Sequence, residues 1–356
     1  MLKTVSLSFV VLLLVAGCST PPKPVPENWQ GTNIFQPLPP VVPPPKPPPP
    51  PTNPPPKLAL TNLIAGTWIP LELWSRVNGL AEPQRISRDL PPAFAVNTHT
   101  GVFAFRAASR VAHWDGMELQ LGYAPVETNG HFVLHTLDLQ KNFSPLLQPG
   151  ALPPRNHRVI VVDPGHGGIN AGAKSVLGNR YEKEFTLDWA KRLAPLLANN
   201  GWTVFLTHTN DVDMALSNRV AFAEAHHADF FLSLHFNSAA PDEKQTGLET
   251  YCLTPMGMPS NLTRHFEDDA ALSFANNSFD TQNLQYAARL HRALLAVNGH
   301  KDRGIRRARF MGVLLGQNRP AVLVEGGYLS NPAEAKQIAT PAYRQKLAEA
   351  IASALQ

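Results

Sequence analysis

The second half of the chain alternates short apolar runs with longer stretches whose apolar residues recur at helical spacing. Runs such as Val159–Val162 and Ala321–Val324 are apolar at every position, which is typical of strands buried on both faces. This pattern predicts an α/β fold with a mostly parallel sheet and helices on both faces. The predicted strands are 158–162, 202–206, 229–234, 248–253 and 321–324, and the predicted helices are 185–199, 216–225, 281–297 and 342–355.

A different pattern precedes this domain, in which short β-like segments are separated by turn residues. Asp115-Gly116 lies between two such segments and predicts a hairpin, and a further strand is predicted at 132–139. We expect a small β-rich domain at 58–150, followed by the larger domain at 151–356. Trp68-Ile69-Pro70-Leu71 and Leu137-Asp138-Leu139 resemble the stalk-like domain named after the N-terminus of copper amine oxidases. This resemblance implies a positioning or binding role, without copper or oxidase activity.

The first residues have the pattern of an export signal. Lys3 is followed by an almost wholly apolar stretch, 5–15, and then by Ala16-Gly17-Cys18. The apolar stretch is shorter than the roughly 20 residues that span a bilayer. The ending resembles the bacterial lipobox, which implies that residues 1–17 are removed and that Cys18 is lipidated; an ordinary cleaved signal is the alternative. Ser19 then favours the outer membrane, facing the periplasm.

Proline sets the next segment apart. The chain has 35 prolines, and Pro47 to Pro51 are consecutive within the proline-rich stretch 18–57. Because proline fixes φ and lacks an N–H group, this stretch cannot form a helix or a sheet ladder. It predicts an extended tether of about 3.1 Å per residue. A ligand for an SH3-type domain is the alternative interpretation.

Composition narrows the function further. The net charge is only +4, with 31 Lys and Arg against 27 Asp and Glu, and no basic run is interleaved with aromatic residues. These features argue against a nucleic-acid partner. The two cysteines, Cys18 and Cys252, exclude a disulfide framework. Cys252 lies in a predicted strand, where a buried thiol is favoured over a catalytic one.

Residues able to bind a metal follow the predicted buried strands. His166, His235 and Glu325 each come just after one of them, and Glu182 begins the first long helix. Ligands of α/β folds gather beyond the carboxyl ends of the strands. Two imidazoles and a carboxylate suit a catalytic zinc, which keeps its fourth position for water. Structural roles remain open: hydrogen bonding for the histidines, helix N-terminal stabilisation for Glu182 and Glu184, and a turn cap for Glu325.

In their residues and order, these motifs resemble those of the zinc-dependent N-acetylmuramoyl-L-alanine amidases over about residues 157–356. The matching segments are Val161–Gly168, Glu182-Lys183, Ser233–Asn237, Val324–Asn331, Leu216–Arg219 and Arg303-Gly304-Ile305. The resemblance implies that Zn²⁺ is bound by His166, Glu182 and His235, whereas Glu184 is not a ligand. It implies that Glu325 is the catalytic carboxylate. The expected reaction is hydrolysis of the amide bond between N-acetylmuramic acid and L-alanine in peptidoglycan by zinc-activated water.

Some positions differ from the family pattern or have an open role. Gly326 and Phe236 replace residues usual in the family, and we expect them to alter substrate fit. Asn237 is predicted to hydrogen-bond the substrate or to steady the site. Segment 254–277 is longer than the minimal family pattern and is either a solvated loop or a cover for the site. The basic residues Lys301, Arg303, Arg306, Arg307 and Arg309 either meet stem-peptide carboxylates or form a solvated face.

The partners predicted from the sequence are therefore peptidoglycan and, through the lipid on Cys18, a membrane of the cell envelope. The sequence does not identify a protein activator. Two alternatives remain within this picture: a catalytically silent peptidoglycan-binding lipoprotein and a zinc peptidase that acts inside the stem peptide. A third, weaker alternative is an activator of other amidases. The presence of Glu325 argues against both non-enzymes, because a binding protein has no need of a catalytic carboxylate.

Overall fold

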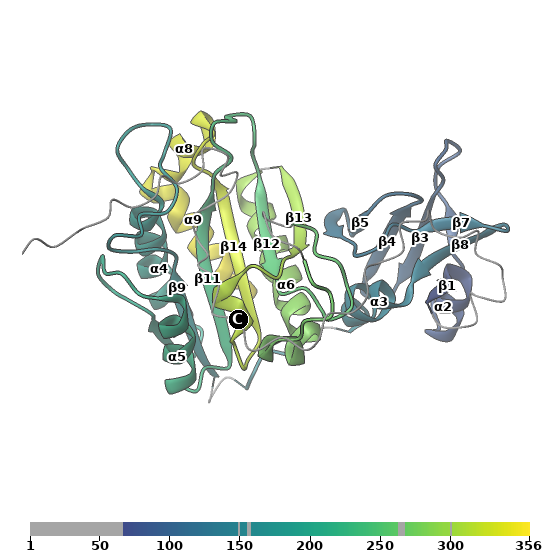
Figure 1. Cartoon of the computed structure of the whole chain (residues 1–356), viewed down its shortest axis with the longest axis horizontal. Helices are drawn as coiled ribbons and strands as arrows, with labels where there is room; N and C mark the ends of the chain where they lie inside the picture. The colour runs from purple at the N-terminus through teal and green to yellow at the C-terminus, as the bar shows by residue number, and fades with distance from the viewer. Residues whose placement is uncertain (1–66, 149, 155–157, 263–267, 300) are drawn as a thin grey trace, which may run out of the picture.

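The structure is a computed structural model that describes residues 67–148, 150–154, 158–262, 268–299 and 301–356. The predicted signal peptide, Cys18 and the proline-rich tether lie outside the described residues. The described chain forms a small domain and a larger C-terminal domain, which lie side by side (Figure 1). Among the described residues, no helix combines the length and the hydropathy that crossing a membrane requires.

The C-terminal domain has the predicted α/β composition, with helices on both faces of a central sheet. Its strands are β9 (Arg158–Pro164), β10 (Trp202–Leu206), β11 (Phe230–Asn237), β12 (Leu248–Cys252), β13 (Asp302–Arg307) and β14 (Ala321–Tyr328). Its helices are α4 (Glu182–Asn199), α5 (Leu216–Ala225), the 3₁₀ helix η3 (Ala275–Phe279), α6 (Asp280–Asn298), α7 (Gly312–Leu315), α8 (Pro332–Ile338) and α9 (Pro341–Ala354). α4 continues through Pro195 to its end.

Two apolar layers sandwich the sheet. Alternate strand residues such as Val162 and Leu234 pack in one buried cluster with Trp189 of α4 and Leu347 of α9. Residues of the opposite face, such as Phe231, pack in a second cluster that includes residues of α5 and α7. The alternation of side chains along a strand therefore assigns every strand residue to the α4/α9 face or to the α5/α7 face.

The strand directions differ from the prediction. In the order β10-β9-β11-β14-β12-β13, the first four strands are parallel, but β12 is antiparallel to β14. The sheet is therefore mixed rather than mostly parallel. The reason lies in the segment 238–247, which joins β11 to β12 and contains no helix. A parallel return requires a crossover of about a dozen residues or more, so the chain re-enters the sheet from the edge where it left.

The small domain is β-rich, as predicted. Its strands are β1 (Trp68–Pro70), β2 (Gln84–Arg85), β3 (Ala93–Thr98), β4 (Gly101–Arg106), β5 (Val111–Trp114), β6 (Met117–Gln120), β7 (Val126–Thr128) and β8 (His131–His135). Its helical segments are α2 (Leu71–Val77), α3 (Thr136–Asp138), the π-helix η1 (Leu139–Phe143) and the 3₁₀ helix η2 (Ser144–Leu147). The hairpin at Asp115-Gly116 is confirmed: both residues have positive φ and connect β5 to β6.

The predicted strand 132–139 is wrong in its second half. β8 ends at His135, whose Nδ1 accepts a hydrogen bond from the Leu137 N–H group and begins a helical turn. The buried carboxylate of Asp138 accepts the backbone N–H groups of Gly122 and Tyr123, each at 2.8 Å. These local hydrogen bonds override the apolar pattern that suggested an extended segment.

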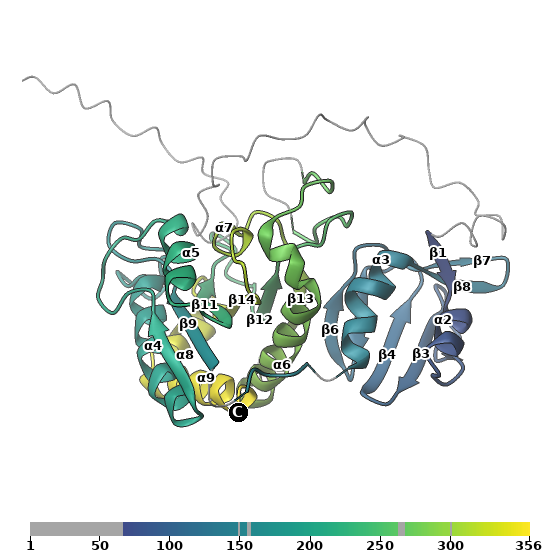
Figure 2. The same ribbon diagram turned by 90° about the horizontal axis from the view of Figure 1, so that it is seen from below.

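The two domains share one sheet. β6 of the small domain pairs in parallel with β13, so the 11-stranded sheet continues from one domain into the other (Figure 2). The Asp302 Oδ2 atom accepts the backbone N–H of Glu118 at 2.7 Å, and the Arg307 Nη2 atom donates to the Lys141 carbonyl oxygen at 2.9 Å. The predicted boundary near residue 150 thus divides the chain but does not divide the sheet.

Gly326 and Phe236 compensate for each other in the core. A Cβ atom on Gly326 would lie 2.8 Å from the Phe236 ring and 2.9 Å from the Trp189 ring. The Phe236 side chain is fully buried, with its ring centroid 5.2 Å from that of Trp189. Both residues lie on the α4/α9 face, whereas their neighbours His235 and Glu325 face the other way. A large ring at position 236 therefore requires glycine on the adjacent strand, and the expectation that the two residues alter substrate fit stays a prediction.

We predict that Gly326→Ala lowers the free energy of unfolding by about 1–3 kcal/mol, because the added methyl group overpacks the core. Shortening the opposing ring with Phe236→Leu makes room for it. The double variant should therefore lose less than the sum of the two single losses. Urea unfolding in one buffer measures all four proteins. Strict additivity of the two losses would contradict the proposed steric coupling.

Candidate metal centre

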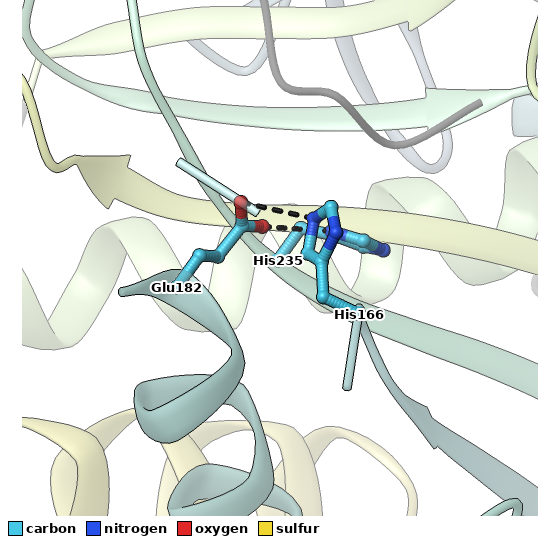
Figure 3. A group of neighbouring side chains, drawn as sticks. All are labelled: His166, Glu182 and His235. Carbon is cyan, nitrogen blue, oxygen red and sulfur yellow. Dashed lines mark hydrogen bonds and ion pairs between the residues drawn. The ribbon is translucent and has the colours of Figure 1, made fainter. Parts of the chain in front are cut away.

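His166, Glu182 and His235 converge at one edge of the sheet. Their ligand atoms all lie within 4.8 Å of one another, and all three side chains are buried. His166 follows β9, Glu182 opens α4 and His235 lies in β11, so segments distant in sequence meet here (Figure 3). The Glu182 carboxylate lies 3.0 Å from His166 Nε2 and 2.8 Å from His235 Nδ1. The predicted convergence of two imidazoles and one carboxylate is thus present in the structure.

In each imidazole, one nitrogen (the inner nitrogen) faces Glu182, and the other (the outer nitrogen) also has a hydrogen-bond partner. His166 Nδ1 lies 2.8 Å from Asn170 Oδ1, and His235 Nε2 lies 3.1 Å from Ser233 Oγ. A proton on each outer nitrogen, donated to these oxygens, leaves the inner nitrogen with a lone pair for a cation. Such outer hydrogen bonds orient the imidazoles of metal sites.

Backbone N–H groups hold the carboxylate itself. Glu182 Oε2 accepts the N–H of Ala173 at 2.9 Å, and Oε1 accepts that of Phe236 at 3.1 Å. The close approach of β9 to β11 also needs a glycine, because a Cβ atom on Gly165 would lie 2.1 Å from the His235 ring. The glycine preceding His166 in the motif therefore makes room for the second imidazole.

The pKa shifts of Glu182 and His235 favour a cation at the triad, whereas for His166 burial would lower the pKa but the neighbouring Glu182 raises it. Burial alone would raise the pKa of Glu182, yet the adjacent His166 and His235 lower it overall, so the carboxylate is ionised. Burial lowers the pKa of His235 and thereby favours the neutral imidazole that binds metals. His166 Nε2 is fully buried and makes no hydrogen bond within the described structure, only its ion-pair contact with Glu182. A cation between these atoms would give that nitrogen a ligand bond.

A buried ion pair that the sequence analysis did not assign supports the site from behind. The Asp163 carboxylate accepts hydrogen bonds from Arg219 Nη1 at 2.7 Å and from Ser233 Oγ at 2.8 Å. Arg219 Nη2 also donates to the carbonyl oxygen of His166 at 2.7 Å. Both histidines therefore connect to Asp163, His166 through Arg219 and His235 through Ser233. Asp163 and Arg219 occur in the matched motifs, but their spacing in sequence gave no sign of this pairing.

Glu325 lies beside the triad, inside a strand rather than after it. β11 and β14 run on to Asn237 and Tyr328, so His235 and Glu325 are strand residues that pair in register. In-register neighbours of parallel strands project on the same face. The side chain of Glu325 is almost completely buried. The structure thus provides a carboxylate one strand away from His235 and separate from the triad.

Asn237 hydrogen-bonds groups of the protein next to the triad. Its Nδ2 atom donates to Glu249 Oε2 at 2.7 Å, and its Oδ1 atom accepts the backbone N–H of Ser238. Its amide thus steadies a buried acid, Glu249, which the sequence analysis did not single out. A charged residue within the otherwise uncharged strand 248–253 was the signal available for it.

Three further predictions can be compared with the structure. Cys252 is a free, buried thiol, as expected, and burial raises its pKa to about 11. Glu184 Oε1 accepts the backbone N–H of Tyr181 at 2.9 Å, so Glu184 begins the helix and does not join the triad. In segment 254–277, Asp268 is not a solvated acid: it accepts a hydrogen bond from Arg309 Nη1 at 2.8 Å, and its side chain is 12% exposed.

We predict that Arg219→Ala lowers the free energy of unfolding by about 3–5 kcal/mol, because it leaves the buried Asp163 charge without its partner. The half-exposed pair of Arg192 with Asp188, at 2.7 Å, provides the matched control. Arg192→Ala should cost less than about 1 kcal/mol. Chemical denaturation of both variants tests this difference, and equal losses would show that Arg219 does not carry the support.

Comparison with known proteins identifies a family for the C-terminal part of the chain. Residues 160–356, more than half of the chain, match the family described as N-acetylmuramoyl-L-alanine amidase. The chain is 31% identical over 226 residues to the amidase AmiA of Escherichia coli K12, a match that covers 58% of this chain and 77% of that protein. It is 33% identical over 241 residues to AmiC of Neisseria meningitidis serogroup B, covering 62% of this chain and 56% of that protein.

The chain is also similar to a solved structure. The crystal structure of an N-acetylmuramoyl-L-alanine amidase from Clostridium difficile 630 is 30% identical, with a TM-score of 0.46. The match covers 56% of this chain and 95% of that one.

Proposed function

Because this chain belongs to the family of N-acetylmuramoyl-L-alanine amidases, we propose that it hydrolyses the amide bond between N-acetylmuramic acid and L-alanine with zinc bound by His166, Glu182 and His235. One observation carries the proposal: three buried ligands converge within 4.8 Å, with Glu325 in register beside them. The donor set supports zinc, since two imidazoles and one carboxylate leave one tetrahedral position open.

The residues around the metal have separate roles in this reaction. When bound, zinc would polarise the scissile carbonyl group and lower the pKa of a water molecule toward about 7. Asn170 and Ser233 keep the inner nitrogens of His166 and His235 aimed at the ion. The Asp163–Arg219 pair holds both ligand-bearing segments in place. The geometry is therefore set before substrate arrives, which limits the reorganisation that the reaction requires.

Glu325 acts as the general base and acid. It takes a proton from the attacking water and returns one to the departing nitrogen of L-alanine, which leaves as an amine. Its near-complete burial and its place one strand from His235 support this role. A zinc peptidase of the stem peptide would use the same groups on a different amide, so the products distinguish the two activities.

The cell envelope is the proposed location. The apolar stretch 5–15 and the lipobox-like Ala16-Gly17-Cys18 support export and lipidation of Cys18. The proline-rich segment 18–57 would then separate the anchored end from the enzyme, and Ser19 supports the outer membrane. A tethered enzyme reaches a polymeric wall at a distance from the membrane. The small domain, joined to the C-terminal domain through β6 and β13, would position the enzyme on that wall.

We predict that Glu325→Gln retains zinc and loses muropeptide cleavage by about 10²–10⁴-fold, because the amide cannot accept the proton of water. Zinc content by elemental analysis and products by mass spectrometry provide the two readouts. The wild-type protein should release intact stem peptides from glycan. Cleavage within the stem peptide would instead identify a peptidase, and full activity of the variant would reject the role of Glu325.

Chelation separates enzyme from binding protein in the same assay. Removal of the metal should abolish cleavage, and added zinc should restore it, because two buried imidazoles and a carboxylate lose their shared ion. A protein that binds peptidoglycan equally well with and without chelator, and cleaves it in neither case, would be the silent lipoprotein.

We also predict that Cys18 is the lipidated residue. Cells grown with a clickable palmitate analogue should label the wild-type protein and leave Cys18→Ala unlabelled. Cys252→Ala serves as the matched control, because Cys252 is buried and free, and its label should equal that of wild type. Label persisting on Cys18→Ala would overturn the predicted anchor.

A further inference from the structure

A row of charged side chains extends from the metal centre across the sheet. His235 of β11 is in register with Glu325 of β14, and Glu325 is in register with Glu249 of β12. The next strand, β13, contributes Arg303 and Arg306. Adjacent strands lie about 4.8 Å apart, so the two arginines start about 10 Å from the Glu325 position. All these groups project from the face that contains the metal ligands.

Glu249 is the buried centre of this row. Its Oε1 atom accepts hydrogen bonds from Arg303 Nε at 2.6 Å and from Tyr328 Oη at 3.1 Å, and it lies 3.5 Å from Arg306 Nε. Its Oε2 atom accepts from Tyr251 Oη at 2.7 Å. Burial would raise the pKa of Glu249, but the positive charges of Arg306 and Arg303 outweigh it and keep the carboxylate ionised. One negative charge thus faces two positive charges, and one positive charge remains in excess.

The two arginines retain donors for a ligand. Arg306 Nε donates a hydrogen bond to the carbonyl oxygen of Arg303. Among the described residues, none forms a hydrogen bond with the Nη atoms of Arg306. Arg303 uses Nε and one Nη atom, the latter toward Gln245 Oε1 at 2.9 Å. Each side chain is 18% exposed. Glu249 therefore holds the two guanidinium groups in place, while some of their Nη atoms stay accessible to a ligand.

The neighbouring arginines are of another kind. Arg307 and Arg309 are 1% and 5% exposed. Arg307 donates to backbone carbonyl oxygens and to a side-chain amide, and Arg309 donates to backbone carbonyl oxygens and to Asp268. They hold loops in place and are not available to a ligand. The expected solvated basic face is thus absent at these two positions, and the positive charge near the site is concentrated at Arg303 and Arg306.

We propose that Arg303 and Arg306 bind a free carboxylate of the stem peptide, two to three residues from the scissile amide, with Glu249 as their positioning residue. This inference rests on the proposed function, since it orients the substrate with L-alanine at Glu325 and the peptide running across β12 to β13. An extended chain spans at most about 3.3–3.6 Å per residue, so two residues reach about 7 Å toward the arginines and a third covers the full distance of about 10 Å. Guanidinium groups often bind a carboxylate through two parallel, charge-assisted hydrogen bonds.

The test compares two muramoyl peptides that differ only at that carboxylate, which is free in one and amidated in the other. Zinc-loaded full-length wild type and Arg306→Gln are assayed on both. Wild type should show a KM about 10- to 100-fold lower for the free carboxylate, the range for a hydrogen bond to a charged group. Arg306→Gln should raise that KM to the value for the amidated peptide, with kcat changed less than about twofold, since uniform binding is lost. KM for the amidated peptide should not change.

Further variants separate binding from structure. Arg306→Lys should recover part of the preference, because it restores the charge without the guanidinium fork. Arg76→Gln, a similar change at an arginine that is 70% exposed on the small domain, should match wild type. Zinc content and thermal midpoint of every variant confirm an intact fold. An equal rise in KM for both peptides, or a fall in kcat alone, would show that Arg306 does not bind the carboxylate.

Failure of the two proposals is distinguishable. If wild type cleaves both peptides with the same KM, the carboxylate site is overturned and the amidase function stands. If wild type with zinc cleaves neither peptide, the proposed function is overturned, and the carboxylate site falls with it.

Discussion

The Glu182 carboxylate, buried between two imidazoles, is the interaction on which this site depends. An ionised carboxylate without contact with water is costly unless charges and hydrogen bonds compensate it. The rings of His166 and His235 flank this carboxylate, and the N–H groups of Ala173 and Phe236 donate hydrogen bonds to it. Because those partners come from separate segments, the carboxylate joins the loop after β9, the start of α4 and the end of β11. The same convergence creates the candidate cation site.

The sheet then distributes the other functional groups. In-register strands place Glu325 and Glu249 in a line with His235, so the spacing of strands sets the spacing of the three proposed roles: metal ligand, proton carrier and anchor for basic residues. Residues of the opposite face, such as Phe236 and Gly326, lie in the core. One sheet therefore separates the candidate site from core packing by the alternation of residues along each strand.

Much of this arrangement could be predicted from the sequence. Strands that are apolar at every position indicated the α/β class. Because few types of side chain bind zinc, the sequence also indicated His166, Glu182 and His235. The direction of β12 could not be read from its residues, since an apolar run is the same in either direction; the helix-free connection 238–247 decided it. The pairing of β6 with β13, the Asp163–Arg219 support and the contact of Gly326 with Phe236 all require side chains that are distant in sequence. Composition and periodicity do not predict contacts between residues that are distant in sequence.

The central claim is that one zinc ion is shared by these three side chains. X-ray absorption at the zinc edge of the full-length, zinc-loaded protein tests it most directly. The account predicts one zinc per chain with two imidazole nitrogens and oxygen ligands at about 2.0–2.2 Å. A His166→Ala variant should lose an imidazole contribution and bind zinc more weakly. A sulfur ligand, or an unchanged zinc spectrum in that variant, would contradict the account.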